Sequence, residues 1–218
     1  MTTTSSALEN LQIIRSLMEK AHIYRAISAP AALVGGILGI LASAWPVQYA
    51  LGHYGDAAMS DTAYVAVWLA ILGIASVMNI VLLSREAARR QQPLVSPGMN
   101  MALRALIPPM LVGGCVGLGL IFFLGSLTLA AIIWILCYGL ALLATASFSP
   151  RSLVRLGWAF VIAGLVLFFA WAANGEVRNL ASDLGPASLA MGLTFGLLHV
   201  LYALAVFYGR QPLEVRPE

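Results

Sequence analysis

The chain has 218 residues, of which 61% are hydrophobic and only 10% are charged, and its formal net charge is +3. A soluble domain carries about 25% charged residues, so this chain has too few charges to cover itself with a solvated surface. The composition therefore excludes an ordinary soluble domain and indicates an integral membrane protein.

Residues 1–25 precede the first long apolar segment and are predicted to form a cytoplasmic tail and an amphipathic helix. They lack the basic start, apolar block and cleavage site of a signal peptide. Ser6 and Glu9 have the spacing of a capping box at a helix N-terminus. The helix either lies on the inner membrane face or under the bundle, or it docks a partner protein or a second protomer. Its apolar stripe consists of Leu11, Ile14, Leu17, Met18, Ala21 and Tyr24.

Six apolar segments are long enough to cross ~30 Å of hydrocarbon at ~1.5 Å per residue. The connecting segments are rich in the glycine, proline and polar residues that are typical of turns. The sequence therefore predicts an all-α polytopic membrane helix bundle over residues 26–209, with six transmembrane helices, followed by a cytoplasmic tail over 210–218. The predicted spans are 28–50, 62–84, 103–124, 127–147, 153–173 and 186–208.

The basic residues fall almost entirely on one side of the predicted membrane. Eleven of the 12 Lys and Arg residues lie on the side of the two termini, and only Arg178 lies on the other side. Because cytoplasmic loops are enriched in Lys and Arg, we expect both termini to be cytoplasmic. The eleven residues are Arg15, Lys20, Arg25, Arg85, Arg89, Arg90, Arg104, Arg151, Arg155, Arg210 and Arg216.

Two stretches, 30–39 and 108–117, share the pattern P-x-x-L-V-G-G-x-x-G. Each opens a helix that is predicted to run outward, and residues 159–167 show a weaker echo. One interpretation is that the chain consists of three tandem helical hairpins in the same orientation. The alternative is chance, because membrane helices often contain Leu, Val and Gly.

Glycines four positions apart occur in three of the predicted helices. They form the pairs Gly35 and Gly39, Gly113 and Gly117, and Gly192 and Gly196. Small residues at this spacing allow the backbones of membrane helices to approach closely. We therefore expect the first, third and sixth helices to pack tightly against neighbours, either in the same chain or in a second protomer.

His199 is the one strongly ionisable side chain that is predicted to lie deep within a span. It shares a helix face with Gly196 and Ala203, so we expect it to point toward protein and not toward lipid. A polar side chain at this depth needs a partner or a water-filled cavity. Three interpretations stay open: a neutral histidine that links helices, a ligand or proton site, and a metal or haem ligand. The candidate partners are Tyr202, Asn79, Tyr138 and Thr145.

The sequence contains no pattern that is typical of a catalytic site. No Asp or Glu lies within a predicted span, whereas a proton- or sodium-driven transporter usually has buried carboxylates or broken helices. Phosphate-binding, metal-binding and nucleophile motifs do not occur. Cys115 and Cys137 lack C-x-x-C spacing, and we expect them to behave as small apolar residues. We therefore expect no catalytic residue, no metal site and no cofactor.

Four stretches are the most characteristic of the chain: IRSLMEKAHIYRAISAPAALVGG (14–36), LLSREAARR (82–90), YGLALLATASFS (138–149) and FGLLHVLYAL (195–204). They resemble a family of uncharacterised bacterial inner-membrane proteins, and the similarity covers nearly the whole chain. The resemblance implies a short N-terminal helix, six spans and a location in the bacterial inner membrane. It also implies a histidine followed by a tyrosine in the last helix, which His199 and Tyr202 match. It implies no activity.

These features predict a non-enzymatic integral inner-membrane protein with a structural, accessory or sensory role. The alternative is a carrier or channel for a small neutral or apolar solute, with His199, Tyr202 and Tyr138 lining a cavity. A third interpretation is a membrane-embedded enzyme or haem protein. The expected partners are the lipid bilayer and either a second copy of the chain or another membrane protein, and we expect no nucleic-acid partner.

Overall fold

The computed structural model describes residues 28–50, 59–89, 91, 97–173 and 183–209. Within these ranges the regular structure is helical and contains no strand. The predicted N-terminal amphipathic helix, the predicted C-terminal tail and Arg178 lie outside the described residues.

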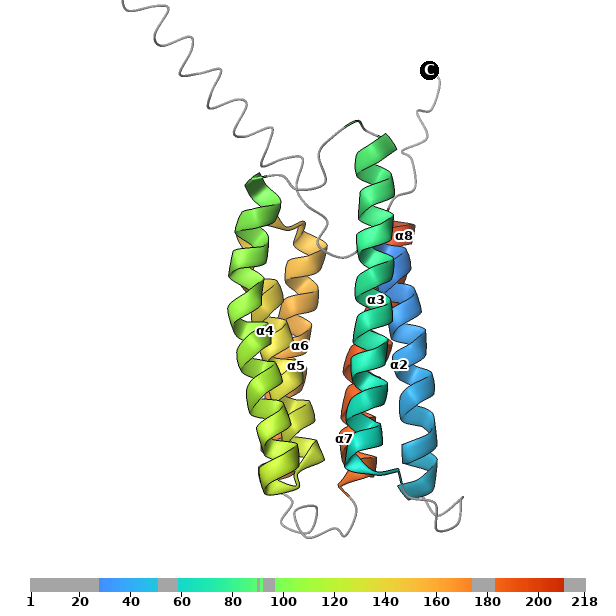
Figure 1. The fold of residues 1–218 in the computed structure, drawn as a ribbon, viewed down its shortest axis with the longest axis vertical. Helices are drawn as coiled ribbons and strands as arrows, with labels where there is room; N and C mark the ends of the chain where they lie inside the picture. The colour runs from blue at the N-terminus through green and yellow to red at the C-terminus, as the bar shows by residue number, and fades with distance from the viewer. Residues whose placement is uncertain (1–27, 51–58, 90, 92–96, 174–182, 210–218) are drawn as a thin grey trace, which may run out of the picture.

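Six helices run up and down in the described part of the chain (Figure 1). They are α2 (Ala29–Ala50), α3 (Asp61–Arg89), α4 (Pro97–Leu124), α5 (Leu127–Ala144), α6 (Arg151–Ala173) and one continuous last helix, Leu184–Tyr208. The last helix consists of α7 (Leu184–Met191), the π-helical segment η3 (Gly192–Leu198) and α8 (His199–Tyr208). A short 3-10 helix, η1 (Ala146–Phe148), follows α5.

Five of these helices are long and apolar enough to cross a membrane: α3, α5, α6, the last helix and the Met99–Leu124 part of α4. In α2, which has 22 residues, the apolar part that can be described covers Ala29–Ala44. The prediction of an all-α membrane helix bundle is confirmed.

Two helices extend beyond their predicted spans. α3 continues to Arg89, and α4 begins at Pro97, whereas the sequence predicted limits at 84 and 103. Apolar composition marks only the part of a helix that lies in hydrocarbon, while backbone hydrogen bonding continues into the polar region. Pro97 stands at the start of α4, where a missing N–H costs no intrahelical hydrogen bond.

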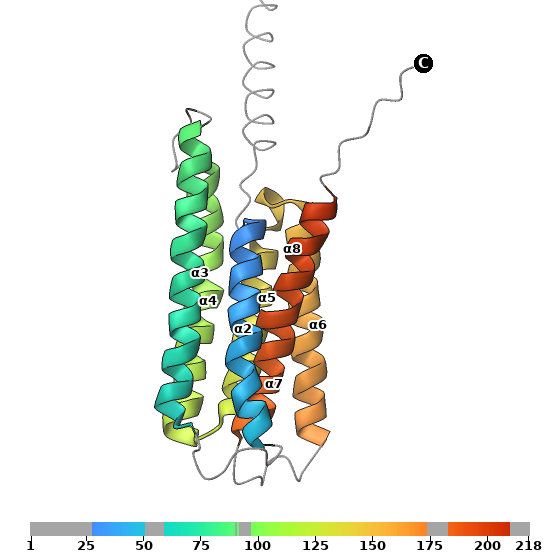
Figure 2. The ribbon, with the colours of Figure 1, turned by 90° about the vertical axis from the view of Figure 1, so that its right-hand side faces the viewer.

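The helices form two layers of three (Figure 2). In one layer α2 lies between α3 and the last helix, and in the other α5 lies between α4 and α6. The layers meet where α5 packs against α7 and where α6 contacts η3 and α8. In two of the predicted hairpins, α2–α3 and α4–α5, the two helices therefore pack against each other. In contrast, α6 packs mainly against α5, and the last helix packs mainly against α2.

The charged residues of the described part lie near the two ends of the bundle, and Glu86 accompanies the arginines at the end of α3. All described arginines lie at one end, near the end of α3 and the starts of α4 and α6 (top of Figure 1). Asp61 and Asp183 lie at the opposite end, at the starts of α3 and the last helix. The described arginines are Arg85, Arg89, Arg104, Arg151 and Arg155.

Candidate functional site

His199 lies between the two layers, at the point where the π-helical segment of the last helix ends. It is the first residue of α8, nine residues before the helix ends at Tyr208, or about 14 Å of helix. Its side chain is buried. The imidazole faces α5 and α6, because its ring contacts Tyr138 and Phe160.

Both ring nitrogens of His199 have hydrogen-bond partners. Nδ1 lies 3.0 Å from the carbonyl oxygen of Phe195, and Nε2 lies 2.8 Å from the hydroxyl oxygen of Tyr138. Because a backbone carbonyl can only accept, Nδ1 donates to Phe195. In the neutral ring Nε2 then accepts from the hydroxyl of Tyr138. The hydrogen-bonding capacity of the imidazole is therefore used within the protein.

Aromatic rings surround this hydrogen bond and form what we name the aromatic cluster: Trp68, Tyr138, Phe160, Phe195 and His199. The centroid of the Tyr138 ring lies 4.8 Å from that of Phe160 and 5.0 Å from that of Phe195. The imidazole stacks on Phe195 at an interplanar angle of 15°. The edge-to-face contact of Tyr138 with Phe160 and its tilted contact with Phe195 are favoured arrangements of aromatic pairs. The cluster joins α3, α5, α6 and the last helix.

The structure places the other three candidate partners of His199, which are Asn79, Thr145 and Tyr202, in different surroundings. The side-chain oxygen of Asn79 accepts from the backbone N–H of Ser28 at 2.9 Å, which fixes the start of α2 on α3. The hydroxyl of Thr145 hydrogen-bonds within the turn that ends α5. Tyr202 is buried in the core, one turn after His199 on the same helix.

Sequence reasoning did not single out Trp68, Phe160 or Phe195. Phe195 precedes His199 by four residues, a spacing that places two helical residues on one face, so this contact had a signal in the sequence. Trp68 and Phe160 come from α3 and α6. Their approach to His199 depends on how distant helices pack, for which the sequence carries no local pattern.

The last helix packs on α2 through a seam of small residues. A Cβ added at Gly36 would lie 2.8 Å from the carbonyl oxygen of Gly196, and one added at Gly39 would lie 3.2 Å from the Gly196 nitrogen. The side chain of Ser43 occupies the space that a side chain at Gly192 would need. We name these five residues the glycine seam. Without side chains at the glycines, the two backbones approach closely.

The remaining predicted glycines face the helix that comes next in the chain. Gly35 lies against Ala75 of α3, and Gly113 and Gly117 lie against Cys137 and Trp134 of α5. Both cysteines are free, and Cys115 is exposed.

The two P-x-x-L-V-G-G-x-x-G stretches make different contacts. Gly36 closes on the backbone of the last helix, but a Cβ at its equivalent, Gly114, would have nothing within 4 Å. Gly35 and Gly113 alone make similar contacts, since each faces the following helix. In both stretches the shared pattern therefore coincides with packing against the next helix in the chain, but the other contacts of the two stretches differ.

Asp183 connects the starts of two helices at the end of the bundle opposite the arginines. Its Oδ2 accepts from the backbone N–H of Thr128 at 2.8 Å and from the hydroxyl of Ser126 at 3.1 Å. The hydroxyl of Thr128 donates to Oδ1. A carboxylate at this position satisfies free amides and the positive end of the dipole of α5. Asp183 lies between the predicted spans 153–173 and 186–208, and the polar residues Ser126 and Thr128 at the start of α5 were the available signal for this contact.

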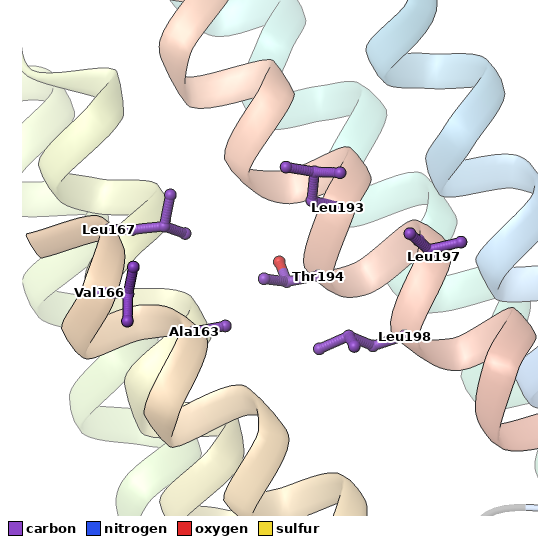
Figure 3. Close-up of a pocket in the computed structure, with 7 residues that line it drawn as sticks. All are labelled: Ala163, Val166, Leu167, Leu193, Thr194, Leu197 and Leu198. Atoms are coloured by element: carbon purple, nitrogen blue, oxygen red, sulfur yellow. The ribbon is translucent and has the colours of Figure 1, made fainter. Parts of the chain in front are cut away.

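A pocket of about 280 Å³ lies between α6 and the last helix (Figure 3). Its lining is aliphatic apart from one threonine, and His199 is not part of it. The lining residues are Ala163, Val166, Leu167, Leu193, Thr194, Leu197 and Leu198. Among the described residues no three His, Cys, Asp or Glu side chains are grouped so that they could hold a metal ion.

Comparison of the chain with protein-family models, with curated proteins and with solved structures gives no match. The function is therefore inferred from the geometry.

Proposed function

We propose that the protein is a non-catalytic component of the bacterial inner membrane, with a structural, accessory or sensory role that depends on a fixed arrangement of its helices. The observation that carries this proposal is the closed environment of His199. Its two nitrogens bond to Phe195 and Tyr138, and aromatic rings pack around it. This arrangement supports a histidine that links the two layers, because no acceptor or donor of the ring is left for a solute.

Modification of histidine by diethyl pyrocarbonate tests this proposal against the alternative of a carrier in which His199 lines a cavity. We expect His199 to react in protein that is unfolded in dodecyl sulfate and to stay unmodified in the folded protein. Peptide mass spectrometry assigns the modified site among the three histidines of the chain. Rapid modification of His199 in folded protein would require a water path to the ring and would favour the carrier.

We further propose that the end of the bundle with the arginines faces the cytoplasm, so that both termini are cytoplasmic. The support is that all described arginines lie at this end, since cytoplasmic flanks are enriched in Lys and Arg. The resemblance of the sequence to six-span bacterial inner-membrane proteins agrees with an even number of spans, which brings both termini to the same side. In this proposal the bilayer is the immediate partner, and the predicted N-terminal helix binds the inner membrane face or a second membrane protein.

Single cysteines at the two ends of α3 test the orientation. In a variant whose native cysteines are replaced by alanine, Asp61→Cys should react with an impermeant maleimide in intact spheroplasts. Arg89→Cys should react only after the membrane is permeabilised. Both positions are exposed, so a reversed labelling pattern would mean the opposite orientation.

A further inference from the structure

The pocket between α6 and the last helix follows from the way in which the two layers pack. Because α6 packs mainly against α5 and the last helix mainly against α2, the two helices diverge where the layers meet. Ala163 and Leu167 of α6 face Thr194 and Leu198 of the last helix across the space (Figure 3). The short side chain of Ala163 leaves much of this space unfilled.

Water is a poor occupant of the pocket. A buried water molecule needs roughly two to four polar partners. The hydroxyl of Thr194 already donates to the carbonyl oxygen of Ala190 at 2.8 Å, and the other lining side chains are aliphatic. Three of the lining side chains, Val166, Leu193 and Leu197, are exposed, so the pocket opens toward the lipid side of the bundle and the occupant has to be apolar.

A helix of a second copy of the chain also fits poorly. Membrane helices approach each other through small residues, but Gly192 and Gly196 of the last helix face α2. The exposed side chains that line the pocket are bulky, as at Val166 and Leu193. A stable interface buries about 800 Å² per partner, whereas this pocket is lined by seven residues.

The depth of the pocket matches a lipid tail. Ala163 and Leu167 lie ten and six residues before α6 ends at Ala173, or about 15 and 9 Å of helix. Half of the hydrocarbon core is about 15 Å thick. On the last helix, Leu193 and Leu198 lie nine and 14 residues after Leu184, or about 14 and 21 Å of helix. The pocket therefore lies near the middle of the hydrocarbon core, which the ends of acyl chains reach.

We propose that the pocket binds one acyl chain of a bilayer phospholipid. All four lining residues of the last helix belong to the π-helical segment η3, a geometry that is rare and often occurs at functional sites. The same segment carries the Phe195 carbonyl that accepts from His199. The bound chain thus contacts the segment that holds the link between the layers.

Photo-crosslinking in nanodiscs tests the proposal. The probe is a phosphatidylcholine with a diazirine at the middle of one acyl chain, diluted in unlabelled phosphatidylcholine. We expect adducts to concentrate on residues 163–167 and 193–198, compared with residues 111–116 of α4, which are also largely exposed. Equal labelling of all three segments would mean ordinary lipid contact and would overturn the proposal.

A matched pair of variants on α6 provides a second, independent measurement. Ala163→Phe fills the pocket and should lower the adducts on residues 193–198 to the level found on α4. Ile162→Phe enlarges the neighbouring exposed side chain, which does not line the pocket, and should leave the adducts unchanged. If Ala163→Phe does not give a monodisperse helical protein, Ala163→Leu takes its place. Undiminished labelling of 193–198 in the folded Ala163 variant would also overturn the proposal.

Discussion

His199 and Tyr138 join the two layers of the bundle through a hydrogen bond of 2.8 Å between the imidazole Nε2 and the phenol oxygen. The two residues are 61 positions apart in the sequence and belong to helices of different layers. Lipid tails are as apolar as the side chains around this bond, so burial of apolar surface alone gives little preference for one layer arrangement over another. The hydrogen bond between His199 and Tyr138 forms only when their two helices lie in the observed positions, so it favours the observed packing of the two layers.

Replacement of Tyr138 by phenylalanine should destabilise the protein. The change removes the donor but keeps the ring, so the buried Nε2 of His199 loses its partner. We expect a loss of about 1–2 kcal/mol in the free energy of unfolding. This lies between the cost of an unsatisfied polar group in a soluble core and the usual contribution of a hydrogen bond between membrane helices. Unfolding by dodecyl sulfate in mixed micelles, followed by circular dichroism, measures this loss. Tyr208→Phe is the control, because Tyr208 is 72% exposed, and an equal effect at both sites would contradict the prediction.

The double variant Tyr138→Phe with His199→Leu separates the hydrogen bond from packing. Replacing both polar partners by apolar groups leaves no unsatisfied polar atom, so the double variant should lose less stability than the two single losses combined. The same titration gives all four free energies. Strictly additive losses would mean that the pair contributes packing alone.

The glycine seam should not tolerate a methyl group at Gly36. In Gly36→Ala the new carbon meets backbone atoms, at 2.8 Å from the oxygen of Gly196 and 3.0 Å from the nitrogen of Val200, so no side chain can move aside. We expect a loss of about 1–3 kcal/mol, typical of overpacking. In Gly73→Ala the new carbon meets nothing within 4 Å, and the higher helix propensity of alanine makes this change neutral or stabilising. The two variants are compared in the same unfolding titration.

The glycines also show how far sequence could predict packing. Spacing predicted close contacts at Gly39, Gly192 and Gly196, because small residues at this spacing are typical of helix contacts, and in the structure these glycines lie between α2 and the last helix. Spacing alone does not name the neighbour. The structure divides the predicted pair, so that Gly35 faces α3 and Gly39 faces the last helix, and it adds Gly36 to the seam.

The partner of His199 shows a second limit. Apolar length predicted the helices, and helical spacing predicted that His199 points into the protein. The choice of Tyr138 over Asn79 depends on the last helix packing beside α2 in one layer and against α5 and α6 of the other, which is a property of the whole arrangement. The π-helical turn before His199 changes the direction of the side chains beyond it, and no sequence pattern indicated it.

Gly117→Ala should disturb the contact between α4 and α5. The added carbon would overlap the indole of Trp134, lying 2.6 Å from its Cδ1 atom, so the ring has to turn out of its place. We expect a shift in tryptophan emission together with a loss of about 1–3 kcal/mol in stability. Gly114→Ala, on the same helix with nothing within 4 Å, should change neither. If the emission shift persists when Trp134 is replaced by phenylalanine, another tryptophan is responsible and the assignment is wrong.

Asp183→Ala should detach the start of the last helix from the start of α5. The carboxylate accepts from the Thr128 backbone and from the hydroxyls of Ser126 and Thr128, so its removal leaves helix-end donors without their acceptor. Loss of such a cap costs about 0.5–2 kcal/mol, and we expect faster amide exchange confined to the first turn of α5. Asp61→Ala is the control, because Asp61 is exposed in the first turn of α3. Faster exchange throughout the bundle would show that Asp183 stabilises the whole fold and not this junction.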